Sequence, residues 1–319
     1  MWKLYRDILN ENKIFYYLTN VQDKRYGEHS LNYRAHYAYE NNLIAIPSKN
    51  SFIYFMPRYD GIKYHLNELP FYYEGVLSAL FPRNFQDETK GKDDKLFKLI
   101  KTHRGTFNEN TRTENATVKI NTDSLKANII TKESLSGQFS TILRHLYLNE
   151  YIDSTLSINY FKKCIDKPFS SNSKIKLSSS INDFPFRYTF NCSQKITFQN
   201  KQSLNIKNWF SFLMSKNTLP ESPNHDYYID FDYTDSYNFL LDFDKPVELK
   251  NADEFTKKIK TDYFNLESEI IKNSENTYLL RVNLIIKDTK ISKNKINLLM
   301  ELVNALDELN NFTVEYIIK

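Results

Sequence analysis

The carboxylates best placed for chemistry form one series in the C-terminal half of the chain: Asp226, Asp230, Asp232, Asp235, Asp242 and Asp244. Asp230 and Asp232 are two residues apart, so on a strand they would point to the same side, as calcium ligands or paired carboxylates do. Calcium takes about six to eight oxygens from a tight loop that usually contains glycine, and no glycine follows Gly137. We therefore expect a half-solvated strand with Tyr and Phe inward and Asp outward, and no metal site.

The two cysteines, Cys164 and Cys192, form no CxxC pair and no zinc spacing. A nucleophilic thiol is favoured at a helix N-terminus, where its pKa is lowered. Cys164 falls at the C-terminal end of a predicted helix and Cys192 in the middle of a predicted strand. We predict that neither is a nucleophile. Two alternatives stay open for these cysteines: a disulfide between them, or two buried thiols.

The histidines and glycines exclude several further sites. The six histidines (29, 36, 65, 103, 145 and 225) never have the i, i+4 spacing of a zinc-binding helix, and His145 is expected at a helix boundary. Ser134 and Gly137 do not form a GxSxG nucleophile elbow. The six glycines are never closer than 14 residues, which excludes Gly-rich phosphate and dinucleotide loops. We expect no cofactor.

Charge and hydropathy argue against a nucleic-acid-binding protein and against a membrane-spanning protein. The 43 Lys and Arg against 39 Asp and Glu give a net charge of +4, too mixed to indicate a nucleic-acid partner. No apolar run reaches the roughly 20 residues of a transmembrane helix, and the sequence after Met1 lacks a secretory apolar region. We expect a soluble chain, either cytoplasmic or exported by a signal outside this sequence.

Hydrophobic periodicity predicts the elements of the first part of the chain. The expected elements are a helix over 2–12, strands over 14–21, 42–47 and 52–56, and a hairpin turn at Lys49 and Asn50. Residues 66–81 carry Pro70 and Gly75 and are expected to be irregular. The polar stretch 83–115 is expected to hold the first domain boundary.

The remainder is predicted to pass from helices to strands. Short strands are expected over 116–120 and 125–131, and helices over 137–165 with a second N-cap at Asp153 and Ser154. From Lys174 the pattern alternates, with strands over 186–190, 196–198, 227–233, 239–243, 278–286 and 312–318. A helix over 293–309 is expected to turn one apolar face inward, made of Ile296, Leu299, Met300, Val303 and Leu306.

A layout of helix, strand, loop and two strands runs through the segments LYRDILNENKI, FYYLTNV and NNLIAIPSKNSFIYFMPRYDGIKYHLNELPFYYEG. This layout, over residues 1–81, resembles the latter half of a transglutaminase-like core, the papain-related fold. The β-rich tail from Lys174 resembles, more loosely, the C-terminal domain of bacterial envelope proteins that carry such a core. The resemblance implies a catalytic Cys on a helix, followed by a sheet that holds a His and an Asp.

The sequence departs from the family at each of these catalytic positions. The Cys would lie upstream of Met1, and an ungapped alignment places Asn41 or Asn42 at the His position and Met56 at the Asp position. Asn and Met cannot accept a proton from a thiol or orient an imidazole. A register shift that uses His36 and Asp60 stays open. Otherwise the resemblance implies a degenerate core that is kept for structure or binding.

We therefore predict an α+β protein with three parts. These are a partial transglutaminase-like region (1–85), a linker plus helical segment (86–173), and a β-sandwich-like domain closed by strand, helix and strand (174–319). The leading hypothesis is a non-catalytic binding or structural module of a bacterial cell-envelope protein, located in the periplasm or at the outer membrane. Its partner would be an envelope protein or a glycan, contacted through a rigid aromatic surface that the 23 Tyr, 23 Phe and 2 Trp suggest. Two alternatives stay open: a cysteine peptidase or transglutaminase whose Cys lies upstream, and a structural remnant of a longer protein.

Overall fold

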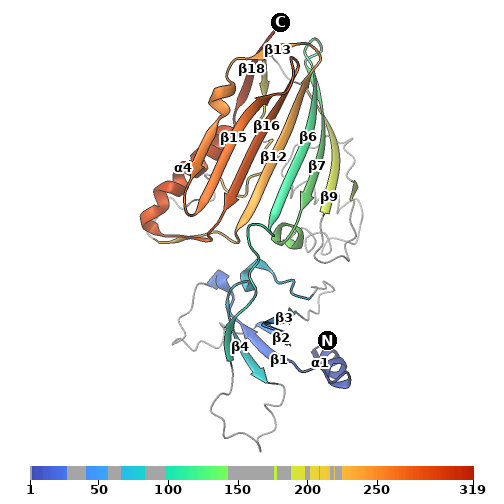
Figure 1. Cartoon of the computed structure of the whole chain (residues 1–319), viewed down its shortest axis with the longest axis vertical. Coiled ribbons are helices and arrows are strands. Elements are labelled where there is room, and N and C mark those ends of the chain that lie inside the picture. The colour runs from blue at the N-terminus through green and yellow to red at the C-terminus, as the bar shows by residue number, and fades with distance from the viewer. Residues whose placement is uncertain are drawn as a thin grey trace, which may run out of the picture. The chain divides into compact units, whose positions relative to one another are not determined.

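The computed structural model shows a mostly β protein that divides into two compact units, Met1–Gly105 and Thr106–Lys319 (Figure 1). It describes residues 2–26, 41–56, 66–82, 98–142, 176–177, 188–197, 202–207, 209–215, 219 and 225–319. Within these residues, no helix has the length and apolar character needed to cross a membrane. The β-rich character expected from the composition is confirmed.

The first unit is an antiparallel sheet with one N-terminal helix. Its elements are α1 (Trp2–Glu11), β1 (Tyr17–Val21), η1 (Lys24–Tyr26), β2 (Asn41–Ser48), β3 (Ser51–Phe55), η3 (Phe71–Tyr73), β4 (Leu77–Pro82) and β5 (Lys98–Lys101). The strands lie in the order β3-β2-β1-β4-β5, and all neighbours are antiparallel. Val21, Leu43, Tyr54 and Leu80 are almost wholly buried and form the centre of its core.

Helix α1 ends in a Schellman motif with a lysine at the position that usually holds glycine. The N–H of Ile14 donates to the carbonyl of Leu9 at 2.9 Å, and the N–H of Lys13 donates to the carbonyl of Asn10 at 3.0 Å. Lys13 has a φ of 55°, a left-handed conformation that a side chain makes unfavourable. The motif turns the chain from the helix into β1.

The hairpin of the first unit matches the prediction, and the segment after it does not. β2 and β3 pair from Ile44 with Phe55 to Ser48 with Ser51, so the turn lies at the predicted residues. The stretch 66–81 was expected to be irregular, but its last residues begin β4, which pairs with all five residues of β1. Pro82 is tolerated because it is the final residue of that strand.

The second unit is built on one eight-stranded sheet. Its strands are β6 (Thr111–Asn121), β7 (Lys126–Leu135), β8 (Lys176–Leu177), β9 (Tyr188–Thr197), β12 (Tyr233–Phe243), β14 (Lys257–Lys260), β15 (Phe264–Lys272) and β16 (Thr277–Ile286). They lie in the order β14-β15-β16-β12-β6-β7-β9-β8. Every neighbouring pair is antiparallel except β12 and β6, which run parallel at the centre of the sheet.

Smaller elements surround this sheet. They are β10 (Ser203–Asn205), β11 (Tyr227–Tyr228), β13 (Val247–Leu249), η5 (Ala252–Phe255), β17 (Lys290–Ile291), η6 (Lys293–Lys295), α4 (Ile296–Asn310) and β18 (Thr313–Ile318). β10, β18 and β13 form a three-stranded sheet, and β11 pairs with β17. The layer opposite the large sheet therefore contains a helix as well as strands.

The large sheet has two different faces, because side chains alternate along each strand. On β12 every second residue is buried, from Tyr233 to Phe243. We call this side the inner face. Phe210 stacks on Phe239 at a centroid distance of 5.3 Å, and Tyr316 of β18 packs on Phe243 at 4.9 Å. The opposite side, the open face, carries half-buried and exposed residues.

Several predictions for this unit are confirmed in type and corrected in detail. The strands predicted at 116–120 and 125–131 exist as β6 and β7, but they are longer, and they join β12 of the predicted domain 174–319 in one sheet. The C-terminal helix and strand exist as α4 and β18. On α4, Met300 is 41% exposed and Leu302 is buried instead. Residues 138–142 are helical, and the remainder of the helical segment predicted there lies outside the described residues.

Candidate binding surface

The aspartate series does not lie uniformly outward. Asp235 is wholly buried and Asp232 is 6% exposed, so the expectation that these carboxylates face solvent is wrong for both. Asp235 occupies an inner-face position of β12, in the same alternation as Tyr237 and Phe239. Its burial needs a buried cation, and the next strand supplies one.

Arg112 of β6 forms that ion pair across the parallel strands. Its Nε donates to Asp235 Oδ1 at 2.8 Å and its Nη2 donates to Asp235 Oδ2 and to the carbonyl of Ser211. Nη2 also donates to the hydroxyl of Tyr237 at 2.7 Å, and that hydroxyl donates to Asp235 at 3.1 Å. The guanidinium lies 5.1 Å from the centroid of the Phe139 ring.

The surroundings of this ion pair are acidic. Glu114 and Glu133 are buried on the same face, at register positions opposite each other on β6 and β7. Burial opposes the charge of Arg112, but the attraction of Asp235 outweighs it, so the pKa of the guanidinium lies well above its ordinary value. Burial also raises the pKa of Tyr237, which stays a neutral hydroxyl. The cluster fastens β6 to β12 and is closed to solvent.

Two further aspartates of the series accept hydrogen bonds from distant segments of the chain. Asp226 accepts the N–H of Lys293 at 3.0 Å and lies 3.4 Å from the ammonium of Lys290. The N–H of Lys293, followed by Lys290, lowers the pKa of Asp226. Asp244 accepts both the N–H and the hydroxyl of Thr122. Nowhere in the described part of the chain do three His, Cys, Asp or Glu side chains gather as metal ligands.

The positions compared with the transglutaminase-like triad are only partly described. Asn41 and Asn42 begin β2, and Met56 follows β3. Because Ile44 pairs with Phe55, Met56 continues the hairpin opposite Leu43. Met56 is 8% exposed and belongs to the apolar core, so it offers no polar group. Four other candidate residues lie outside the described residues. They are His36 and Asp60, considered for the triad, His145, considered as a ligand, and Cys164, considered as a nucleophile. Cys192 lies in β9, and Ser134 is the last residue but one of β7.

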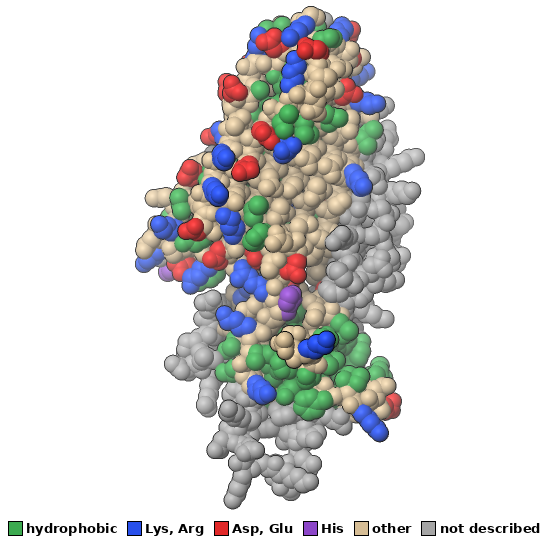
Figure 2. Space-filling view, viewed as in Figure 1, with side chains coloured by type: hydrophobic (Ala, Val, Ile, Leu, Met, Phe, Trp, Pro, Cys, Tyr) green, Lys and Arg blue, Asp and Glu red, His purple; other side chains and the backbone are tan. Residues whose placement is uncertain are grey.

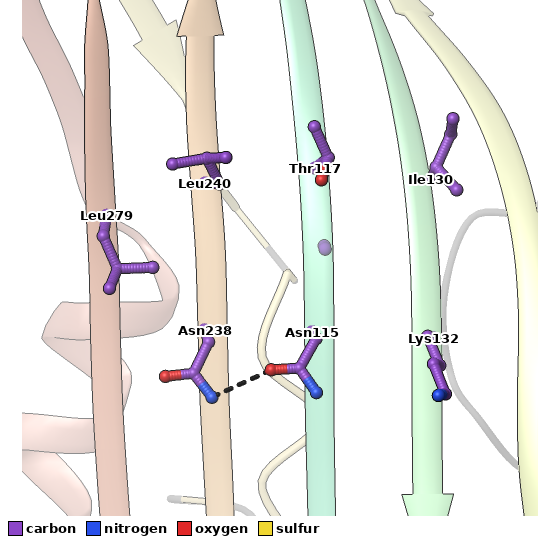
Figure 3. A pocket seen from close by; sticks show the side chains of 8 residues that line it. Asn115, Thr117, Ile130, Lys132, Asn238, Leu240 and Leu279 are labelled. Carbon is purple, nitrogen blue, oxygen red and sulfur yellow. Dashed lines mark hydrogen bonds between the residues drawn. The ribbon is translucent and has the colours of Figure 1, made fainter. Parts of the chain in front are cut away.

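The open face carries a hollow of about 420 Å³ over four adjacent strands. It is lined by Asn115, Ala116 and Thr117 of β6, Ile130 and Lys132 of β7, Asn238 and Leu240 of β12, and Leu279 of β16. Figure 3 shows the labelled side chains standing side by side on the strands. In Figure 2 the centre of this face is largely uncharged, with few acidic or basic side chains.

Strand register arranges the lining into two rows that cross the strands. The amide row joins Asn238, Asn115 and Lys132, which are cross-strand partners in the register. Asn238 Nδ2 donates to Asn115 Oδ1 at 3.1 Å, which leaves the Asn115 amide nitrogen on the side of Lys132 (Figure 3).

The aliphatic row lies two residues further along the strands. It contains Leu279, Leu240, Thr117 and Ile130, again as cross-strand partners. Ile130 is 50% exposed, a large apolar side chain that meets water. Polar donors next to exposed aliphatic groups are suited to hold a ligand with both kinds of surface.

The aromatic residues do not supply this surface. The largest wholly buried side chains are mostly Tyr and Phe, so in the described residues the aromatic richness is used mainly in the two cores. The described strand positions on the open face are occupied by Thr, Ser, Asn, Lys, Asp, Glu, Arg and aliphatic residues. The sequence analysis missed the hollow, although the alternation of polar residues along 111–121 and 126–135 was the signal for it.

Comparison with known proteins does not assign the chain to a family: no family model, no curated protein and no solved structure matches it.

Proposed function

We propose that this chain is a non-catalytic binding module that holds its ligand on the open face of the eight-stranded sheet. The observation that carries the proposal is the hollow of about 420 Å³, with its amide row and its aliphatic row. Lys132 is the one ionisable residue among those that line it. The lining thus offers hydrogen bonds and apolar contact, and few groups that could transfer a proton.

The first unit supports the same proposal through its resemblance to a transglutaminase-like core. At the position of the family's Asp the chain has Met56, whose side chain belongs to an apolar core. We propose that this unit is a degenerate core within an α+β protein of the bacterial cell envelope, in the periplasm or at the outer membrane. The peptidase or transglutaminase alternative gains no support from the described residues, and the remnant alternative does not account for the hollow.

The test uses one variant on the open face and one matched control. Leu240→Arg places a charged chain across the hollow, and Leu4→Arg makes the same change at a leucine of α1 that is 60% exposed. Each tagged protein is incubated with cell-envelope extract, and the retained protein and glycan are identified. Urea unfolding of all three proteins confirms that they are folded.

We expect wild type and Leu4→Arg to retain the same component and Leu240→Arg to lose it. Equal retention by Leu240→Arg would show that the open face does not bind the ligand. Failure of the wild-type protein to retain any component would likewise contradict the proposal.

A further inference from the structure

The charged residues on the open face of β6 and β7 are all lysines, although the whole chain is nearly neutral. The solvent-facing positions of these two strands carry Lys119, Lys126 and Lys132, and none carries a carboxylate. The acidic residues of the same strands, Glu114 and Glu133, are both buried on the inner face. On these two strands the carboxylates therefore lie only on the inner face, where Arg112 is also buried, and the lysines lie on the open face.

Each of these lysines lies opposite an asparagine. The register pairs Lys132 with Asn115 and Lys119 with Asn128. Directly opposed residues on one face of an antiparallel pair have Cβ atoms about 5 Å apart. An ammonium and an amide N–H₂ at that separation can donate to the two oxygens of one carboxylate.

The pairs Lys132–Asn115 and Lys119–Asn128 lie on either side of the aliphatic row. Along β6 the open-face positions are Asn115, Thr117 and Lys119, so successive rows are about 7 Å apart. An extended peptide repeats its same-side residues at the same interval of about 7 Å. A peptide that runs along β6 can therefore present one side chain to each row.

We infer that the ligand of this hollow is an extended acidic peptide with the pattern acidic-x-aliphatic-x-acidic. Its first carboxylate binds Lys132 and Asn115, its aliphatic side chain packs on Leu240 and Ile130, and its second carboxylate binds Lys119. This inference rests on the proposed function and adds the class of ligand.

Two features of the face favour a peptide over a glycan. The described positions carry no aromatic ring, so a sugar ring finds no flat apolar surface on which to stack. The aliphatic row instead matches branched side chains such as Leu or Ile.

The two acid-binding positions are not equivalent. Asp242 lies beside Lys119 in the register of β12 and β6, and it opposes a second carboxylate there. Lys132 has Asn238 and Asn115 in its row instead. Replacing Lys132 must therefore weaken binding more than replacing Lys119.

The test measures fluorescence anisotropy of a labelled heptapeptide with Asp at positions 2 and 6, Leu at position 4 and Thr elsewhere. A second peptide has Asn in place of both Asp residues. The proteins are the full chain, Lys132→Gln, Lys119→Gln and the control Lys258→Gln. Lys258 is an exposed residue of the edge strand β14, on the same face of the sheet, so its variant has the same loss of charge.

We expect the acidic peptide to bind about tenfold more tightly than the amide peptide, since each of two exposed ion pairs strengthens binding about threefold. Lys132→Gln should weaken binding about three- to fivefold, Lys119→Gln less, and Lys258→Gln not at all. The preference should decrease as salt is added.

Three results would overturn the inference. They are equal binding of the two peptides, an equal loss in Lys258→Gln and Lys132→Gln, and tighter binding of an acidic oligosaccharide such as an oligouronate. If one of these occurs while Leu240→Arg still abolishes retention from extract, the class of ligand is wrong and the proposed function stands. If Leu240→Arg retains its ligand, the proposed function itself is wrong.

Discussion

Removing the cation at position 112 should destabilise the second unit severely. In the native protein the Arg112 and Asp235 side chains are 8% and 0% exposed. Arg112→Met keeps most of the side-chain volume but leaves Asp235 buried with Glu114 and Glu133 and without their cation. Breaking a buried ion pair from one side costs about 3–5 kcal/mol, and we expect Arg112→Met to fall in that range.

Asp235→Asn, which removes the carboxylate instead of the cation, should lower the free energy of unfolding less, because the cluster contains more carboxylates than cations. In Asp235→Asn the guanidinium keeps the carbonyl of Ser211 and the hydroxyl of Tyr237, and it still lies near Glu133. We expect a loss of about 1–3 kcal/mol. The double variant Arg112→Met, Asp235→Leu removes both charges, so it should be more stable than Arg112→Met alone.

The assay is urea unfolding followed by tryptophan fluorescence. The sequence has two Trp, and Trp209 contacts Phe239 of β12 at a centroid distance of 5.8 Å. A Trp2→Phe background therefore leaves one reporter, inside the second unit, and linear extrapolation gives its free energy of unfolding. A loss below about 1 kcal/mol in Arg112→Met, or strictly additive effects in the double variant, would refute this reasoning.

Three further changes test other parts of the molecule. Gly137→Ala should lower the unfolding free energy by more than about 1 kcal/mol in the same assay, because Gly137 has a φ of +56° and an added Cβ would lie 2.3 Å from Asn110 Oδ1. Lys13→Gly should raise the stability of the first unit by about 0.5–1 kcal/mol, since glycine adopts the left-handed conformation without steric cost; calorimetry would measure it. Asp226→Asn should lower stability at about pH 6, and the difference should disappear as the pH falls below about 4, because the native pKa of Asp226 is lowered and its contribution is lost when it is protonated.

Each of these three changes has its own contradicting result. For Gly137, wild-type stability of the alanine variant would show that the loop adapts. For Lys13, the control is Lys13→Ala, which keeps a Cβ; an equal gain in that variant would assign the effect to loss of the lysine side chain. A difference between Asp226→Asn and wild type that is independent of pH would exclude the carboxylate as its cause.

The sequence pattern predicted the structure correctly where residues close together in the chain determine it. The hairpin of β2 and β3 follows from alternating apolar residues around Lys49 and Asn50, and the pairing of Ser48 with Ser51 confirms the turn. The amphipathic period of α4 was also correct, but Met300 and Leu302 lie on either side of its apolar stripe. Only the shape of the layer under the helix decides which of the two is buried.

Distant partners explain most of what the sequence did not predict. Asp235 was expected to be solvated as one of a series of outward-facing aspartates on a half-solvated strand, whereas its burial depends on Arg112, 123 residues away. β5 contains two lysines in four residues and was missed, because its strand structure comes from pairing with β4. The hollow required the alignment of four strands, and no single segment carries that information.

The parallel pair at the centre of the sheet has a consequence for how the protein is made. β6 and β7 are adjacent in the chain, but β12, the parallel partner of β6, is synthesised much later. Asp235 of β12 follows Arg112 of β6 by 123 residues. At about 5–20 residues per second, a ribosome needs roughly 6–25 seconds to cover that distance. During this interval the hairpin of β6 and β7 has an unpaired edge and an exposed Arg112, and strands with open edges pair readily with other chains. A nascent chain stalled before Tyr233 should therefore depend on chaperones, and the dependence should end once β12 and β16 have emerged.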